Sequence, residues 1–169
     1  MADQNDIKFR QLIVPHFEAA YNLARWLTGN DTDATDVLQE ASLKAFRFME
    51  SLKSENPRAW FFQIVRNTSY TVLKARKKYV ELDFEKDIED LRPNPEGLLL
   101  QDVTAKELYE ALDELPVQYR EVIVLREIEE TSYEDIAAIL QIPSGTVMSR
   151  LARARGLLKK KLIAKGVGS

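Results

Sequence analysis

The chain has 169 residues, of which 45% are hydrophobic and 30% charged, enough for one medium-sized core or two small ones. Its formal charge of −3 argues against a protein that coats nucleic acid along its whole surface, because such binding depends on neutralising phosphates. The absence of cysteine excludes disulfides and thiolate metal sites, and the lack of a long apolar run or an apolar N-terminus predicts a cytoplasmic chain without a membrane span.

Apolar residues recur at helical spacing along most of the chain, and no segment alternates as a strand does, so the pattern predicts an all-α protein. The first apolar stripe covers residues 9–27, restarts at Pro15 and ends at Gly29. The segment NDTDATD then opens a helix over Asp33 to Phe48, since aspartates stabilise a helix N-terminus. A third helix, over Arg58 to Lys78, follows the loop SLKSENP. These three helices can close one core.

The charge of the chain changes sign after this third helix. Arg58 to Lys78 contains six lysines and arginines and no acid, whereas Glu81 to Glu114 contains twelve acids and three cations. The acidic stretch includes LRPNPEG, whose two prolines and glycine interrupt any helical period. We therefore expect two small helical domains, over residues 1–78 and 103–169, joined by an acidic flexible linker over residues 79–102.

The C-terminal domain contains a helix-turn-helix pattern. Ser132 is suited to cap a first short helix, the residues QIP must then turn the chain, and Ser144 can cap a second helix. From Ser144 onward there is no acidic residue, so the outward face of this helix suits DNA, with short polar groups near base edges and arginines near guanines or phosphates. The alternative is the solvated surface of an ordinary helix pair. The expected DNA-binding residues are Ser144, Thr146, Ser149, Arg150, Arg153 and Lys160.

A second basic face is expected on the helix over residues 58–78. Its polar positions recur at helical spacing opposite the apolar stripe and include a tyrosine. Cations beside an exposed aromatic ring suit an opened or single strand, because a base can stack on the ring while the backbone is neutralised. The alternative is that Tyr70 and Trp60 close the core and the cations are solvated. The expected residues are Trp60, Gln63, Arg66, Asn67, Tyr70, Lys74 and Lys77.

A third face lies on the helix over residues 33–48 and consists of Asp36, Gln39, Glu40, Leu43 and Arg47. An exposed leucine ringed by charge suggests a protein-docking site, although an ordinary solvated face gives the same pattern. No nucleophile, base and orienting group occur in a recognisable arrangement, and the sequence has no glycine-rich phosphate loop. We therefore expect no catalytic residue, no metal, no cofactor and no enzymatic activity.

Three segments of the sequence stand out together. They are LTGNDTDATDVLQEASLKAFRF, NPRAWFFQIVRNTSYTVLKARKK and LDELPVQYREVIVLREIEETSYEDIAAILQIPSGTVMSRLARARGLLKKKL. In order and at matching separations, they resemble the second and fourth regions of extracytoplasmic-function (ECF, group 4) sigma factors, members of the sigma-70 family of bacterial RNA polymerase. The resemblance covers nearly the whole chain except the linker and the ends. Three motifs in the right order are far more specific than a lone helix-turn-helix.

The resemblance implies a sigma factor that binds core RNA polymerase and directs promoter-specific transcription initiation. Asp36, Gln39 and Glu40 match the family's face for the clamp helices of the largest polymerase subunit. The helix from Trp60 to Lys74 matches the part that melts the minus-10 element, and Ser144 to Arg155 match the helix that reads the minus-35 element. Residues 1–78 would then be region 2 and residues 103–169 region 4. The family also implies an anti-sigma factor as a partner and a monomer when the chain is free.

The sequence departs from the family pattern in the turn and on the recognition helix. Gln141 stands where the family often has a glycine, so we expect a turn residue near positive φ at a cost of roughly 1 kcal/mol. Met148 stands where the family often has a lysine, which bears on promoter preference. The acids of Glu81 to Glu114 are tethered close to both basic faces, and we expect them to mask these faces at low salt.

The sequence features described above are also compatible with two other functions. A stand-alone helix-turn-helix regulator would use the N-terminal helices to dimerise and would bind duplex DNA unaided. A helical adaptor would use its basic faces to bind acidic protein. A sigma factor should instead co-purify with core polymerase as a monomer.

Overall fold

The computed structural model describes residues 3–53, 55–79 and 103–166, and within these ranges it consists of helices and turns without any strand. This confirms the predicted all-α class. The predicted linker lies outside the described residues, apart from Tyr79. The elements are α1 (Gln4–Leu12), a 3-10 turn (Val14–His16), α2 (Phe17–Thr28), α3 (Asp31–Arg47), a 3-10 turn (Met49–Ser51), α4 (Pro57–Ala75), α5 (Ala105–Asp113), α6 (Val117–Ile123), a π-helical turn (Val124–Ile128), α7 (Tyr133–Leu140) and α8 (Ser144–Ala164).

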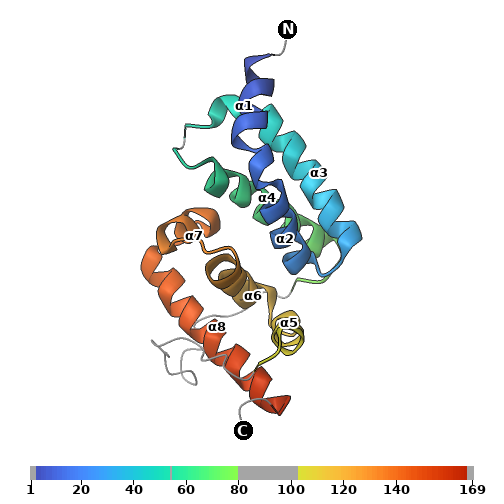
Figure 1. Ribbon diagram of the computed structural model, residues 1–169, viewed down its shortest axis with the longest axis vertical. Helices are drawn as coiled ribbons and strands as arrows, with labels where there is room; N and C mark the ends of the chain where they lie inside the picture. Colours follow the sequence, from blue (N-terminus) through green and yellow to red (C-terminus); the bar gives the residue numbers. More distant parts are fainter. Residues whose placement is uncertain (1–2, 54, 80–102, 167–169) are drawn as a thin grey trace.

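Helices α2, α3 and α4 pack against one another, with α1 lying along α3, and form the N-terminal group (Figure 1). The chain restarts its helix around Pro15 as predicted, and Gly29 ends α2 with φ of 88°, a left-handed conformation that glycine adopts without a steric penalty. Phe61 and Phe62 are both fully buried in the core, while the neighbouring Trp60 lies at its edge. The three predicted helices therefore do close a common core.

Helices α6, α7 and α8 form the C-terminal group, and α5 packs on α8. Ser132 caps α7, since its hydroxyl accepts a hydrogen bond from the backbone N–H of Asp135 at 3.1 Å. Gln141 ends α7 with φ of 57°, which confirms the expected left-handed turn residue. The expectation that Ser144 caps α8 is wrong: Pro143 occupies the N-cap position, and its carbonyl accepts from the N–H groups of Thr146 and Val147.

The two groups lie against each other, with α7 beside α4 and α6 beside α2 (Figure 1). Trp26 of α2 meets Tyr109 of α5 edge to face, with ring centroids 5.2 Å apart. The described chain thus has an interface between two helical groups in addition to the core of each.

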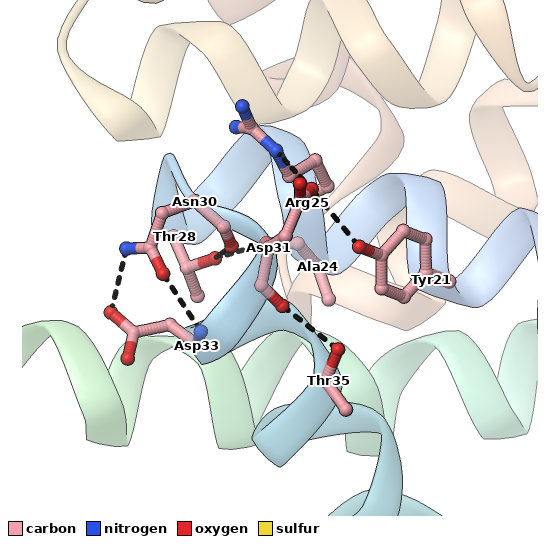
Figure 2. A network of polar contacts seen from close by, with 8 residues as sticks. All are labelled: Tyr21, Ala24, Arg25, Thr28, Asn30, Asp31, Asp33 and Thr35. Carbon is pink, nitrogen blue, oxygen red and sulfur yellow. Dashed lines mark hydrogen bonds and ion pairs between the residues drawn. The ribbon is translucent and has the colours of Figure 1, made fainter.

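A polar network ties the start of α3 to the end of α2 (Figure 2). The side chain of Asn30 accepts from the N–H of Asp33 at 2.8 Å and donates to the Asp33 carboxylate at 2.9 Å. Asp31 accepts from the Tyr21 hydroxyl at 3.0 Å and from Arg25 at 2.9 Å. The same end of α3 is joined to the end of α4 by an ion pair between Asp33 and Arg76 at 2.7 Å. These contacts set the direction of α3 and therefore the side on which its polar face lies.

Replacing Asn30 with alanine should lower the free energy of unfolding by about 1 kcal/mol, because the first turn of α3 loses its side-chain cap. The measurement is urea denaturation followed by circular dichroism. The matched control is Asn22→Ala, which changes an exposed asparagine in the middle of α2 and should leave stability unchanged or slightly higher. Equal effects of the two substitutions would contradict the role assigned to the cap.

Candidate nucleic-acid and protein interfaces

The face of α3 that the sequence singled out is exposed over its whole length. Its opposite side is buried through Ala34, Val37, Ala41 and Ala45, which turns the polar positions toward solvent. Leu43 is 66% exposed, and Glu40 forms an ion pair with Lys44 at 3.4 Å. Leu43 is not isolated, because Phe46, one turn further on, is 41% exposed, and together they form an apolar surface beside the charges that suits another protein. The exposed residues of this face are Asp36, Gln39, Glu40, Leu43 and Arg47.

Next to this face, an apolar groove of about 630 Å³ runs between α1 and α3. Phe9 lies in it, edge to face with both Phe46 and Phe17, at centroid distances of 5.6 and 5.9 Å. Leu43 lines its rim, so the groove continues the α3 face. Sequence analysis missed this groove, although Leu43 and Phe46, three residues apart and off the buried stripe, were the available signal.

The outward face of α8 is formed as predicted, with one exception. Ser149 and Lys160 are exposed, and Ser144, Thr146 and Arg153 are partly exposed. Arg150 differs, because its Nε is buried and its guanidinium lies close enough to Glu121 for the carboxylate charge to act on it. Burial lowers the pKa of the Arg150 guanidinium, and the Glu121 carboxylate opposes that effect. The Arg150 side chain therefore points toward the buried side of α8 and away from its outward face.

The predicted face of α4 is divided between solvent and the C-terminal group. Asn67, Lys74 and Lys77 are exposed, and Trp60 and Gln63 are partly exposed. Tyr70, however, is only 7% exposed, so the expectation of an exposed aromatic ring does not hold in this arrangement. The physical reason is that α6 brings Glu121 against this part of α4.

Arg66 of α4 and Glu121 of α6 form a paired contact through two parallel hydrogen bonds. Arg66 Nε donates to Glu121 Oε2 at 3.0 Å and Nη2 donates to Oε1 at 3.1 Å. The Glu121 side chain is fully buried, and the Arg66 side chain is 21% exposed. The guanidinium also lies 3.9 Å from the ring centroid of Tyr70. The two donors of the Arg66 guanidinium satisfy both oxygens of the Glu121 carboxylate, which has no access to water.

Burial dominates the titration of this cluster. It raises the pKa of the Glu121 carboxyl, and the hydrogen bonds and charge of Arg66 oppose that rise. It also raises the pKa of the Tyr70 phenol far above its ordinary value, and the nearby Glu121 charge adds to the rise. Tyr70 is therefore a neutral phenol at any physiological pH.

A second set of polar contacts joins the N-terminus of α4 to the first turn of α7 and to the segment before it. Arg58 donates to the carbonyl of Glu129 at 2.8 Å and to the hydroxyl of Thr131 at 3.2 Å. Asn56 donates through its amide to the Asp135 carboxylate at 2.8 Å. None of these pairs was expected from sequence. The one available signal was Glu121, an acid that stands at helical spacing between the buried Val117 and Leu125.

Within the described ranges, no three side chains of histidine, aspartate or glutamate gather in a way that could hold a metal ion. The same part of the chain has no helix with the length and apolar character needed to cross a membrane.

Residues 12–79 match the family model for sigma-70 region 2, and residues 105–158 match the model for sigma-70 region 4. The first match contains the α3 and α4 faces, and the second contains the helix-turn-helix except the last turns of α8. The two matches lie in the order expected from the sequence motifs.

The chain is 34% identical over 172 residues to the ECF RNA polymerase sigma-E factor of Haemophilus influenzae, covering 94% of this chain and 90% of that protein. It is 32% identical over 155 residues to the ECF RNA polymerase sigma factor SigE of Mycolicibacterium smegmatis, covering 90% of this chain and spanning 60% of that protein's length. Its fold is similar, with a TM-score of 0.69 and 29% identity, to the sigma factor RpoE of Bartonella quintana crystallised with the anti-sigma factor NepR, covering 96% and 99% of the two chains. With both regions matched and the likeness extending over nearly the whole chain, the protein belongs to the ECF sigma factors of the sigma-70 family.

Proposed function

We propose that the protein binds core RNA polymerase and directs initiation at promoters that it recognises through their minus-35 and minus-10 elements. The observation that carries this proposal is that an exposed protein-docking face on α3 and an acid-free outward face on α8 occur together, one in each sigma region. In this proposal residues 1–78 act as region 2, residues 79–102 as the linker and residues 103–169 as region 4. The factor works in the cytoplasm, where polymerase and promoter DNA are found.

The α3 face supports docking on polymerase because Leu43 offers an apolar contact surrounded by Asp36, Gln39 and Glu40. Buried apolar anchors within a polar rim are the usual source of binding energy between proteins. The clamp helices of the largest polymerase subunit, implied by the family resemblance, are the proposed partner of this face.

On α8, Thr146, Ser149 and Arg153 lie on the side opposite the buried stripe and suit the reading of the minus-35 element. Region 2 is proposed to open the minus-10 element with Asn67, Lys74 and Lys77, together with the aromatic residues of α4. An anti-sigma factor is proposed as a regulator, and the similarity to a sigma factor crystallised with such a protein supports this.

The decisive experiment is run-off transcription with bacterial core polymerase and a library of promoters. We expect the chain to direct initiation from a subset of promoters that share spaced upstream and downstream elements, since core polymerase alone lacks this specificity. If the isolated chain instead dimerises and shifts duplex DNA without polymerase, it is a stand-alone regulator. If it has no effect on DNA even with polymerase present, a helical adaptor is the better description.

The double substitution Gln39→Ala/Glu40→Ala should weaken binding to core polymerase about tenfold or more, because two polar side chains of the docking face are removed. Holoenzyme assembly followed by fluorescence anisotropy measures this affinity, and circular dichroism checks that helicity is kept. The matched control is Gln11→Ala/Glu50→Ala, which removes the same two side-chain types from exposed positions outside α3. Normal assembly of the α3 variant would remove the docking assignment.

In the assembled holoenzyme, Arg153→Ala should weaken promoter binding and reduce the slope of log K against log salt by about 0.9 for each phosphate that the side chain no longer neutralises. The control Lys159→Ala removes one charge from a different side of α8 and should change the slope less. The measurement is a salt titration of promoter affinity. An unchanged slope for Arg153→Ala would argue against an interaction of this arginine with phosphate.

A further inference from the structure

The interface between the two helical groups covers part of the face that region 2 is proposed to present to DNA. We infer that the free chain is held in a closed state in which the Glu121 carboxylate takes the place of a DNA phosphate on Arg66, so that region 4 withholds the minus-10 face. This inference rests on the proposed function, because the face withheld is the one proposed to contact the opened strand. The device is built from the chain's own residues and needs no other protein.

Each nitrogen of the Arg66 guanidinium already donates a hydrogen bond within the protein in this state. Two of its nitrogens donate to the two oxygens of Glu121, at 3.0 and 3.1 Å, and Nη1 donates to the side-chain oxygen of Asn67 at 3.4 Å. A guanidinium fork binds a carboxylate and a phosphate through the same planar geometry. Glu121 and a phosphate would therefore compete for the Arg66 guanidinium. Asn67, on the same face of α4, accepts the third hydrogen bond of that guanidinium.

The same interface also prevents a nucleic-acid base from stacking on the ring of Tyr70. The Arg66 guanidinium lies 3.9 Å from the centroid of its ring, and the ring of Tyr79 meets it edge to face at 5.5 Å. With 7% of the residue exposed, no base can lie on the ring. Separation of α4 from α6 would break the contact between Arg66 and Glu121, and this would free the guanidinium and the ring together.

The same carboxylate also acts on region 4. Arg150 of α8, which the sequence placed among the minus-35 residues but which points away from the outward face, is close enough for the Glu121 charge to affect its titration. Glu121 thus interacts with Arg66 of the proposed minus-10 face and with one cation of α8. When the two groups separate, Arg150 remains in the same helical group as Glu121 and can pair with it, which lowers the cost of exposing the carboxylate.

The interface combines polar and apolar contacts. Beyond the Arg66 contact, it contains the polar contacts of Arg58 with Glu129 and Thr131 and of Asn56 with Asp135, and the ring pair Trp26–Tyr109. Apolar residues of both groups also meet in it, where Leu27 and Leu73 line one pocket with Leu115 and Val117. A buried ion pair adds little net stability, because the desolvation of both charges offsets most of their attraction. Docking of α3 on polymerase or capture of DNA can therefore shift the equilibrium toward the open state.

The test uses the full-length chain, whose lack of cysteine allows two to be introduced, Gln11→Cys on α1 and Lys159→Cys on α8, for spin labels. Distances between the labels are measured by pulsed electron resonance in this background and with Glu121→Gln added. We expect Glu121→Gln to give longer and broader distances, because the charge that pairs with Arg66 is removed. We also expect the isolated variant to bind a short labelled single-stranded DNA about tenfold more tightly than the parent chain.

The matched control is Glu127→Gln, which removes one negative charge from a glutamate that pairs with Arg155 inside the C-terminal group. It should change neither the distances nor the affinity. Should Glu121→Gln fail to fold, Arg58→Gln loosens the other end of the same interface and should open the chain in the same assay. Wild-type distances in a folded Glu121→Gln variant would overturn the closed state held by this residue. Longer distances without a gain in DNA affinity would overturn the masking, while run-off transcription tests the proposed function separately.

Discussion

Helix α4 has one apolar side and one polar side, and the arrangement of the other helices depends on which of them covers each side. Phe61 and Val65 are fully buried, and the Phe61 ring meets Phe17 of α2 at 5.8 Å between centroids, so the apolar side cannot change partners without unfolding. The side that carries Arg66 and Tyr70 lies against region 4, through Glu121 of α6 and through α7. Because a helix is only about 10–12 Å across with its side chains, it cannot present the same residues to region 4 and to DNA. The arrangement of the two regions therefore decides whether this face is available.

Glu121 links the chemistry of the two regions. It stands within the apolar stripe of α6 and is completely buried, and a buried carboxylate needs a cation and hydrogen-bond donors to compensate for the hydration it gives up. Arg66 supplies both across the interface, and Arg150 supplies charge from α8. The acids that we expected from the sequence to mask the basic faces run from Glu81 to Glu114, and those up to Asp102 lie outside the described ranges. Of the described ones, Glu114 pairs with Lys165 at 2.7 Å. The basic face of α4 is met by Glu121, an acid further along in region 4.

The α3 face depends on different contacts from those of α4. Asn30, Asp31 and Asp33 tie the start of α3 to α2 and, through Arg76, to the end of α4. These contacts lie within region 2, as do the helices α1, α2 and α4 against which α3 packs. The proposed docking face and the groove beside it are consequently exposed while region 4 covers Arg66 and Tyr70. Under the proposed function, a factor in this state can meet a protein partner through α3 before the proposed minus-10 face is uncovered.

The sequence by itself determined the features that depend on near neighbours along the chain. Gly29 and Gln141 adopt the expected left-handed turns, Ser132 caps its helix, and Leu43 is exposed, because each follows from the geometry of one helix or one turn. The tertiary structure alone decided that Tyr70 is buried and that Arg66 meets Glu121, 55 residues further along the chain. Helical periodicity identifies which side of α4 is polar, but it contains no information about what that side contacts. That contact is decided by the packing of the two helical groups against each other, in which a buried carboxylate on one meets its cation on the other.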